Sequence, residues 1–321
     1  MESLGQPLSR AVDGLGFVSD REVGTPGFVA GGGDAVEPRV SVVIPVRNGA
    51  ATLPTQLAAL ARQQDAPPFE VIISDNGSTD GTRSVAEGFA DRLAIRIVDS
   101  SDRRGPAHAR NVGAAAARAP HLLFCDADDR VSDAWVGAMH RALEKHRIVT
   151  GPTYYVDASR LEDAERYRPR TEQTAPRLYL DRIPFSASNN LGIRAELFRE
   201  LGGFDPGLQC GEDADLSIRA QLAGAELAWA PDGVVYHARR ESLAGAARQF
   251  FRYGFYNAKV YRKLRGTGLF RRPAWTVLRP YLVLVVTPYR LFTRSRWSWI
   301  INASQRAGRI VGSFRFRVFC P

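Results

Sequence analysis

Short apolar runs alternate with stretches of helical character over the first 125 residues, and this alternation restricts the fold more than any other feature. The apolar runs lie at Val40–Val46, Glu70–Ser74, Ala94–Val98 and His121–Cys125, and each has the length of a buried strand. The intervening stretches are residues 50–63, 80–91 and 106–119, the last of them rich in Ala. Because strands that alternate with helices usually pair in parallel, we expect an α/β fold with a mixed, mostly parallel sheet flanked by helices.

Composition divides the chain into three predicted regions. Residues 1–37 are rich in Gly, Pro and acids and hold no apolar stretch typical of a secretory signal, so we expect a mobile tail there. Residues 38–240 would form the α/β domain, and residues 241–321 a basic, aromatic-rich helical extension. With 321 residues and 45% hydrophobic content, the chain can bury a large core, in one large domain or two smaller ones.

The charge is distributed unevenly along the chain. From Arg239 to the end there are 18 Lys and Arg residues and one acid, while the chain as a whole has a net charge of +9, so the preceding part is acidic. A basic arm on an acidic body suggests an anionic partner, either a membrane surface or nucleic acid. The three cysteines, Cys125, Cys210 and Cys320, share no metal-ligand spacing, which suits a reducing, cytoplasmic compartment.

Polar segments follow three of the predicted strands at the point where each strand ends. They are Arg47–Gly49, Asp75–Gly81 (DNGSTDG) and Asp126–Asp129 (DADD). Loops after the carboxyl ends of parallel strands meet at one edge of the sheet and commonly form a binding site. DNGSTDG by itself is typical of an Asx turn, but together with DADD it favours a nucleotide site.

The acids of DADD are close enough to repel one another. Asp126 and Asp128 flank one residue, so in an extended turn both can point to the same side. Mg²⁺ or Mn²⁺ would relieve this repulsion, and a diphosphate would supply further oxygen ligands. The alternative is a helix N-terminus that stabilises the acids, and Asp129 suits that role because a helix is expected from Ser132.

Five segments together resemble glycosyltransferase family 2. They are SVVIPVRNGAATL, EVIISDNGSTDGT, GPAHARNVGAA, LLFCDADD and GEDADLSIRA, and the resemblance covers residues 38–237. It implies the GT-A fold, which is Rossmann-like, and transfer of a sugar with inversion from a nucleotide-diphosphate donor, usually a UDP-sugar. The acceptor would be a hydroxyl, plausibly of a lipid-linked or cell-envelope glycan.

The resemblance also implies residue roles on the donor side. Asp75 would hold the base, Pro45, Val46 and Arg47 would line the nucleoside pocket, and Asp126 would contact ribose or sugar hydroxyls. Arg110 would lie near the donor, and Asn76 stands where the family often has a second acid. The donor-binding residues implied are Pro45, Val46, Arg47, Asp75, Asn76, Arg110, Asp126 and Asp128.

On the reaction side, the resemblance implies that Asp213, with its neighbour Glu212, is catalytic and removes a proton from the acceptor hydroxyl. Asp128 would bind the metal, and His237 would approach the diphosphate or complete the metal shell. Asn189 and Asn190 are expected to face the acceptor. For Asp213 and Glu212 the alternative is a stabilising position at a helix start, and Asp215 with Arg219 would be a surface ion pair.

The basic extension contains two distinct segments. Leu243–Leu264 is predicted to be an amphipathic helix, and within it Gln249–Tyr253 (QFFRY) is close to the QxxRW pattern of processive relatives, with Tyr in place of Trp. This departure favours single sugar additions. Thr276–Phe292 is too short and too interrupted to span a bilayer, and it either lies in a membrane interface or packs on the body.

Two other classes of protein are weighed against the transferase. A sugar nucleotidyltransferase would have a Gly-rich, basic phosphate loop after the first strand, and PVRNGAATL is a poor match to that loop. A nucleic-acid-binding protein without catalysis would account for the basic arm, but no recognised nucleic-acid-binding motif accompanies the charge. We therefore expect a cytoplasmic enzyme, peripheral on the inner face of the plasma membrane, with nucleic acid an improbable partner.

Overall fold

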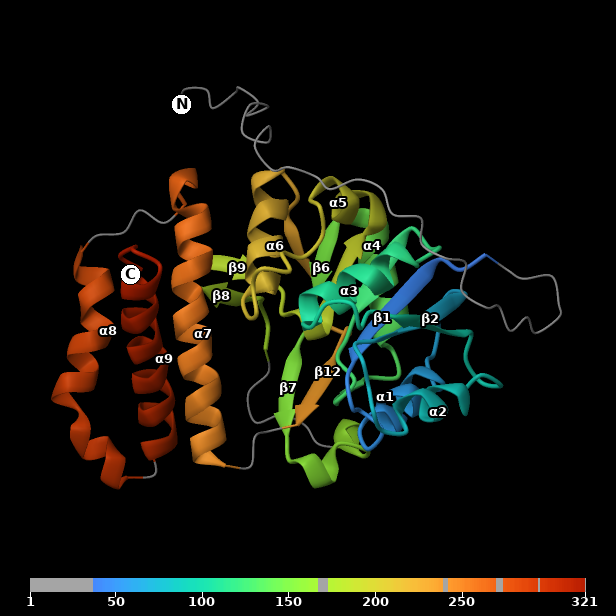
Figure 1. The fold of residues 1–321 in the computed structure, drawn as a ribbon, viewed down its shortest axis with the longest axis horizontal. Coiled ribbons are helices and arrows are strands. Elements are labelled where there is room, and N and C mark those ends of the chain that lie inside the picture. The colour runs from blue at the N-terminus through green and yellow to red at the C-terminus, as the bar shows by residue number, and fades with distance from the viewer. Residues whose placement is uncertain (1–36, 167–172, 239–241, 270–273, 294, 321) are drawn as a thin grey trace. The chain divides into compact units, whose positions relative to one another are not determined.

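The computed structural model describes residues 37–166, 173–238, 242–269, 274–293 and 295–320, and these belong to one compact unit. Figure 1 shows a central sheet with helices on both faces and a group of C-terminal helices beside it. The predicted tail, except for its last residue, and the predicted boundary at 240 lie outside the described residues. The expected mixed α/β architecture is confirmed.

Seven strands form the central sheet, in the order β11-β6-β10-β4-β1-β2-β3. Strand β10 runs antiparallel to both of its neighbours, and the other pairs are parallel. The four predicted strands occupy adjacent places at one side of this sheet, each within one or two residues of the expected bounds. The strands are β1 (Val40–Val46), β2 (Phe69–Asp75), β3 (Ile95–Asp99), β4 (His121–Phe124), β6 (Ile148–Thr150), β10 (Leu191–Arg194) and β11 (Leu227–Trp229).

Each face of the sheet buries its own apolar cluster, because side chains alternate along a strand. Val42 and Ile44 of β1 join the cluster that includes Trp135, whereas Val43 joins the cluster that includes Phe124. The helices that cover the sheet are α1 (Leu53–Leu60), α2 (Thr82–Glu87), α3 (Pro106–Ala115), α4 (Trp135–Lys145), α5 (Ala195–Glu200) and α6 (Glu212–Leu222).

Several predicted helices are shorter than expected. Helix α2 is bounded by Gly81 and Gly88, and α3 ends at Ala115 although the Ala-rich sequence continues. Helix α4 begins at Trp135 and not at Ser132, because residues 129–131 form a strand instead of a helix cap.

Two small sheets complete the α/β part of the chain. A three-stranded sheet has the order β5-β12-β7, and a two-stranded hairpin pairs β8 with β9. Strand β12 carries His237, one of the residues expected at the site. The bounds are β5 (Asp129–Val131), β7 (Thr153–Val156), β8 (Arg177–Tyr179), β9 (Ile183–Phe185) and β12 (Val235–Ala238).

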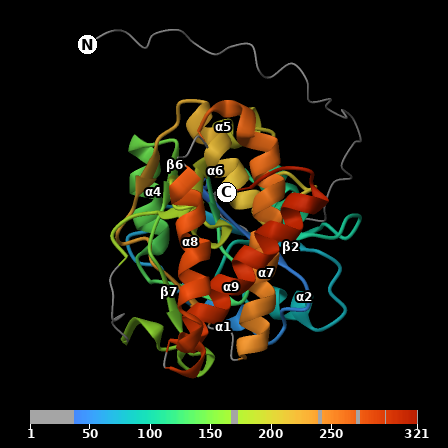
Figure 2. The ribbon, with the colours of Figure 1, turned by 90° about the vertical axis from the view of Figure 1, so that its left-hand side faces the viewer.

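The C-terminal extension consists of three long helices. Helix α7 has the predicted bounds, Leu243–Leu264, and it packs along α9 (Arg296–Arg315) with the two backbones in close approach (Figure 2). A Cβ atom at Gly254 would collide with the carbonyl oxygen of Gln305, and one at Gly308 with that of Phe251, so glycine is required at this crossing.

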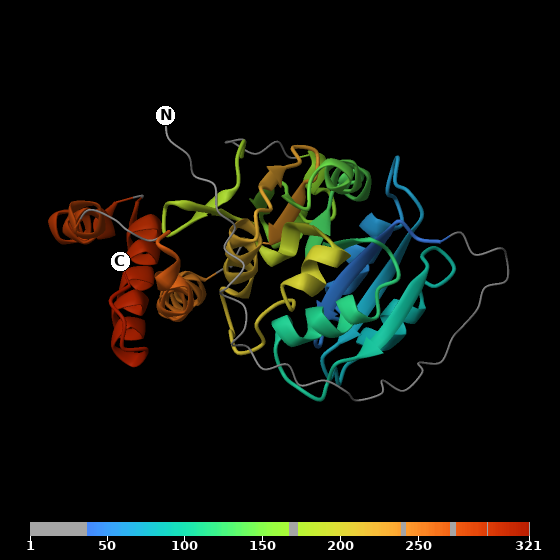
Figure 3. The same cartoon turned by 90° about the horizontal axis from the view of Figure 1, so that it is seen from above.

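Helix α8 (Ala274–Val286) and a following 3₁₀ turn (Pro288–Phe292) contain the apolar segment predicted at residues 276–292. In Figures 1 and 3, α8 lies on the side of α9 away from the central sheet. Among the described residues, no helix combines the length and apolar character needed to cross a bilayer.

Candidate active site

The loops that follow β1 and β2 are joined by hydrogen bonds between their tips. The backbone N–H of Asn48 donates to Ser78 Oγ (3.0 Å), and Asn48 Oδ1 accepts from the N–H of Thr79 (2.8 Å). The N–H of Gly49 donates to Thr82 Oγ1 (2.8 Å). Because β4 pairs with β1 in parallel, its carboxyl end lies at the same edge of the sheet. The three polar loops therefore come together, as expected.

Asp75 and Asn76 at the end of β2 have different surroundings. Asp75 Oδ1 accepts a hydrogen bond from the N–H of Ser78 (2.9 Å), which fixes the turn around Gly77 (φ 78°). The Asn76 amide donates to the carbonyl of Arg103 (2.9 Å), and its oxygen accepts from the N–H of Gly105 (3.0 Å). The Asn76 side chain thus holds the loop before α3, and its expected contact with the donor stays a prediction.

The predicted nucleoside segment is only partly accessible. The Val46 side chain is buried in the core, and its carbonyl accepts from the N–H of Asn76 (2.8 Å). Pro45 is half-buried and Arg47 is exposed. A ligand at this edge would therefore meet Pro45 and Arg47 before it met the Val46 side chain.

Arg110 on α3 links two of the predicted site carboxylates. Its Nη2 donates to Asp126 Oδ1 (2.6 Å) and its Nη1 to Glu212 Oε1 (3.0 Å). Burial by itself would lower the pKa of Arg110, but the two carboxylates outweigh burial and the pKa is raised. The guanidinium is therefore a permanent cation at the centre of the site.

Glu212 and Asp213 begin α6 at the edge of the same site. Burial, reinforced by the neighbouring Asp213, raises the pKa of Glu212 to about 7. Burial also raises the pKa of Asp213, whose Oδ1 accepts from the N–H of Ala214 (2.7 Å) and whose Oδ2 accepts from the N–H of Ser188 (3.3 Å). A carboxyl group whose pKa is raised toward working pH is suited to accept a proton.

Asp129 is not a helix cap, contrary to the alternative considered from the sequence. It lies in β5, fully buried, where its Oδ1 accepts from Nδ1 of His237 (2.5 Å) and its Oδ2 from the Asn189 amide (2.7 Å). Burial raises the pKa of Asp129 to about 6, and the bond to Asp129 raises the pKa of His237 against the effect of burial. With Nδ1 engaged, Nε2 is the nitrogen of His237 that is left for a ligand.

The acidic residues and His237 at this edge of the sheet are the candidate ligands for a divalent metal. Among the described residues, no three His, Cys, Asp or Glu side chains converge into a metal-binding group. Asp128 is exposed, and its charge together with that of Asp126 acts on His237, which indicates that the three groups are near one another. Mg²⁺ and Mn²⁺ often take one or two carboxylates and complete their shell with water and substrate phosphates. The residues therefore fit a metal whose shell is completed by a bound diphosphate.

The two asparagines expected to face the acceptor differ in position. Asn190 is fully buried, where its Oδ1 accepts from Trp135 Nε1 (2.8 Å) and its amide donates to the carbonyls of Pro152 (2.9 Å) and Gly233 (2.8 Å). Its side chain joins α4 to the loops behind the sheet, so the acceptor-side prediction is wrong for Asn190. Asn189 lines the cavity described next, while its amide holds Asp129.

A cavity of about 650 Å³ lies between these residues and the C-terminal helices. One wall holds Asp126, Asn189, Glu212, Asp213 and His237. The opposite wall comes from α7, α9 and the β8–β9 hairpin. Because the catalytic candidates face this space, a substrate that enters it lies alongside the C-terminal helices.

The far wall was only partly foreseen from the sequence. Gln249, Arg252 and Tyr253 of the QFFRY segment all line the cavity, and Gln249 Nε2 donates to the Tyr253 hydroxyl (2.6 Å). Arg306 of α9 and Ser188 were not singled out in advance. The run of arginines on α9 was the available signal for Arg306, whereas Ser188 acts through its backbone N–H and no side-chain pattern could have marked it.

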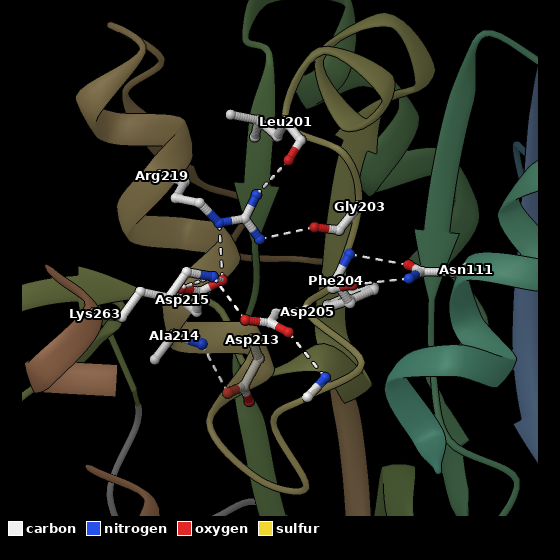
Figure 4. A network of polar contacts seen from close by, with 11 residues as sticks. Asn111, Leu201, Gly203, Phe204, Asp205, Asp213, Ala214, Asp215, Arg219 and Lys263 are labelled. Atoms are coloured by element: carbon white, nitrogen blue, oxygen red, sulfur yellow. Dashed lines mark hydrogen bonds and ion pairs between the residues drawn. The ribbon is translucent and has the colours of Figure 1, made fainter. Parts of the chain in front are cut away.

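Asp215 and Arg219 do not form the surface pair that the i,i+4 spacing suggested. Figure 4 shows both within a network that ties α6 to α7. The fully buried Asp215 accepts from Arg219 Nε (2.8 Å) and from Lys263 Nζ (3.0 Å), and Lys263 also pairs with Asp205 (2.9 Å). Arg219 further donates to the carbonyls of Leu201 (2.6 Å) and Gly203 (2.8 Å). This network holds the helix that carries Asp213.

Comparison with known proteins identifies the family. The sequence model described as "Glycosyl transferase family 2" matches residues 41–202, half of the chain. The chain belongs to this family. Family 2 thus accounts for the strands and loops from β1 to α5, while α6 to α9 lie beyond the matched residues.

Curated relatives of the chain are glycosyltransferases. Validoxylamine A glucosyltransferase from Streptomyces hygroscopicus subsp. limoneus is 34% identical over an alignment of 220 residues, and the match covers 58% of this chain and 49% of the relative. Pre-mycofactocin glycosyltransferase from Mycobacterium tuberculosis is 30% identical over 211 residues, 64% of this chain and 43% of the relative. The chain thus spans about half the length of these two relatives. Glycosyltransferase AglE from Haloferax volcanii is 31% identical over 209 residues, 63% of this chain and 68% of the relative.

Solved structures share the fold. A mannosyltransferase from Pyrobaculum calidifontis, in complex with GDP-Man and Mn²⁺, superposes with a TM-score of 0.57 at 19% identity. The match covers 87% of this chain and 88% of the mannosyltransferase chain. TarS from S. aureus, residues 1–349, in complex with UDP superposes with a TM-score of 0.50 at 19% identity. The match covers 87% of this chain and 92% of the TarS chain. The predicted GT-A fold is confirmed by these similarities.

Proposed function

We propose that this protein is an inverting glycosyltransferase that moves a sugar from a nucleotide-diphosphate donor, preferably a UDP-sugar, to an acceptor hydroxyl. The observation that carries the proposal is the pair of buried carboxyls Glu212 and Asp213, with raised pKa values, facing a cavity next to the nucleotide-type loops. Membership of family 2 favours sugar transfer over the sugar nucleotidyltransferase and nucleic-acid-binding alternatives.

On the donor side, Asp75 would accept a hydrogen bond from the base, beside Pro45 and Arg47. Arg110, held by Asp126 and Glu212, would lie near the diphosphate. Asp128, with His237, would hold Mg²⁺ or Mn²⁺, and the metal would supply positive charge to the leaving diphosphate. The complex of the Pyrobaculum mannosyltransferase with GDP-Man and Mn²⁺ supports a metal of this kind.

Asp213 is the proposed base because of the contacts that each acid makes. Glu212 is occupied by Arg110, whereas the Asp213 oxygens accept only backbone N–H groups, from Ser188 and Ala214. The carboxylate would take the proton of the acceptor hydroxyl as its oxygen attacks the anomeric carbon. The bond from that carbon to the donor phosphate breaks in the same step, so the configuration inverts. Asn189 would border the acceptor.

We further propose that the C-terminal helices dock on an anionic membrane surface. Trp275, Val285 and Phe292, on and just after α8, are exposed, Phe292 to 92%. They lie in a segment where Lys and Arg outnumber acids by 18 to one from Arg239 onward. Exposed apolar side chains together with basic charge fit an anionic interface. The inner face of the plasma membrane is the proposed location, and a lipid-linked acceptor is consistent with it.

A screen of UDP-, GDP- and dTDP-sugars for hydrolysis by the full-length protein, with Mn²⁺ or Mg²⁺, tests the proposal. We expect metal-dependent release of a nucleoside diphosphate from at least one donor, strongest with a UDP-sugar. Release of a nucleoside monophosphate, or of nothing from any donor, would contradict it.

The same assay tests the metal role of Asp128. Asp128→Ala should abolish metal-dependent donor binding while the fold remains intact, because Asp128 is exposed. The loss of donor-binding free energy should exceed about 1 kcal/mol, the stability that is typically lost when a helix cap is removed. Asp232→Ala, at another exposed acid, is the matched control. Undiminished turnover in Asp128→Ala, together with insensitivity to a chelator, would exclude this role.

A further inference from the structure

A second cavity, of about 420 Å³, lies between α8 and α9. Its α8 side presents Pro280, Val283 and Leu284, and its α9 side presents Trp299 and Arg306. Figure 2 shows the two helices side by side. The cavity thus combines an apolar wall with a wall that carries N–H donors.

Two of those donors are buried without an acceptor. Trp299 Nε1 and Arg306 Nε are inaccessible to water and have no hydrogen-bond acceptor among the described residues. The other recorded bonds of Arg306 run from Nη1 back to Asn302, to its carbonyl (3.2 Å) and its Oδ1 (3.0 Å). Buried donors are nearly always satisfied in native proteins, so an orphaned pair marks a place where a bound group supplies the acceptors.

The electrostatics of this cavity select an anion. Arg279 and Arg290 line it as well, and no carboxylate is among the described residues that line it. Burial and the neighbouring Arg309 lower the pKa of Arg306, and Tyr281 and Asp181 oppose this shift only in part. An anionic ligand would offset the desolvation of the guanidinium and its repulsion by Arg309.

The cavity also communicates with the candidate active site. Asn302 and Arg306 line both this cavity and the larger one that contains Asp213. An anion held by Arg306 therefore lies at the junction of the two spaces, with apolar surface on one side and the catalytic carboxyls on the other.

We propose that the α8–α9 cavity binds the phosphate head and the adjoining apolar chain of a lipid phosphate that carries the acceptor hydroxyl. The phosphate oxygens accept from Arg306 Nε and Trp299 Nε1, and the chain lies over Val283 and Leu284. This inference rests on the proposed glycosyltransferase function and names the chemical class of its acceptor.

Calorimetric titration of the full-length protein with octyl phosphate, below its micelle concentration, tests the proposal. Inorganic phosphate and octyl glucoside are the comparison ligands, the first lacking the chain and the second the charge. We expect octyl phosphate to bind at least tenfold more tightly than either. If inorganic phosphate binds as tightly as octyl phosphate, the site is one for free phosphate and the proposal is overturned. If octyl glucoside binds as tightly as octyl phosphate, the anionic group contributes nothing to binding and the proposal is likewise overturned.

Variants locate the site. Arg306→Gln should weaken octyl phosphate binding about tenfold, because a charge-assisted hydrogen bond is lost. Trp299→Phe keeps the ring and removes one donor, so a loss of about fivefold is expected. Arg315→Gln, on the exposed end of the same helix, should leave binding unchanged. Unchanged binding in both Arg306→Gln and Trp299→Phe would contradict the assignment.

The two proposals fail separately. A protein that transfers sugar to a neutral acceptor but does not bind octyl phosphate contradicts only the lipid phosphate site. A protein that binds octyl phosphate through Arg306 but cleaves no sugar nucleotide contradicts only the glycosyltransferase function.

Discussion

Glu212 and Asp213 are adjacent in the chain, yet their side chains have different partners. Glu212 pairs with the buried guanidinium of Arg110, which also binds Asp126. Asp213 receives only backbone N–H groups, and Arg110 acts on it without a direct hydrogen bond. This difference in partners is the basis for proposing Asp213, and not Glu212, as the base.

Replacement of the proposed base separates binding from chemistry. Asp213→Asn should retain donor affinity and lower single-turnover transfer on the order of 10²–10⁴-fold, the usual contribution of a general base. Asp232→Asn, at an exposed acid outside the lining of this cavity, should retain transfer and serves as the control. Wild-type transfer by Asp213→Asn, or a parallel loss of donor affinity, would count against the role of Asp213.

The raised pKa values set the pH dependence of transfer. Burial moves the pKa of Glu212 from 4.5 to about 7 and raises that of Asp213, so the pair holds a proton at mildly acidic pH. Since the base acts only when deprotonated, kcat/KM should fall as the pH is lowered, with its acidic limb displaced above the ordinary Asp value of 3.8. An acidic limb near pH 4, as for an ordinary carboxyl, would show that the pair is not perturbed as described.

Among the secondary-structure elements, the contact between α6 and α7 depends on a buried network. Asp215 is surrounded by Arg219 of its own helix and Lys263 of α7, and Lys263 reaches Asp205 as well. A carboxylate removed from this network leaves two cations without their shared partner. The position of Asp213, two residues before Asp215, depends on the same helix.

Asp215→Ala should lower the free energy of unfolding by roughly 3–5 kcal/mol, the cost of removing one partner from a buried pair. Arg166→Ala removes the exposed pair with Asp163 and should cost less than about 1 kcal/mol. Chemical denaturation of both variants makes the comparison. Equal small effects would indicate that Asp215 is better solvated than its burial implies.

The length of an element decided whether it could be predicted. Val40–Val46 and Leu243–Leu264 were predicted with correct bounds, since a mostly apolar, β-branched run and about six turns of amphipathic helix are both clear signals. Strands β5, β6 and β11 have three residues each, too few to show alternation, and were missed.

Long-range partners explain the errors at the site. Asp129 was considered as a helix cap because its partners His237 and Asn189 lie 108 and 60 residues away. Asp215 was expected in a surface pair with Arg219 because its other partner, Lys263, lies 48 residues further along the chain, where no local pattern indicates the contact. The loops with Asp75, Asp126 and Asp213 were predicted because each is a local motif, whereas the cavity wall formed by α7 and α9 depends on tertiary packing.

At the scale of the whole molecule, the distribution of charge and exposed apolar side chains predicts which of its surfaces docks on a membrane. Trp275→Ser combined with Phe292→Ser should reduce co-sedimentation with anionic vesicles at least tenfold, since each inserted ring contributes about 2 kcal/mol. Leu222→Ser, at an exposed apolar residue on α6, is the control and should have no effect. Equal binding to neutral and anionic vesicles, or no loss in the double variant, would exclude docking through this surface.

The active-site cavity combines residues from inside and outside the family match. Asp126 and Asn189 fall within residues 41–202, whereas Glu212, Asp213, His237 and the wall from α7 and α9 follow that segment. On the proposed assignment, sequence changes confined to α7 and α9 would change which acceptor is glycosylated and leave the proposed donor loops unaltered. For engineers, grafting the C-terminal helices of one relative onto the donor domain of another is the corresponding route to new glycosides.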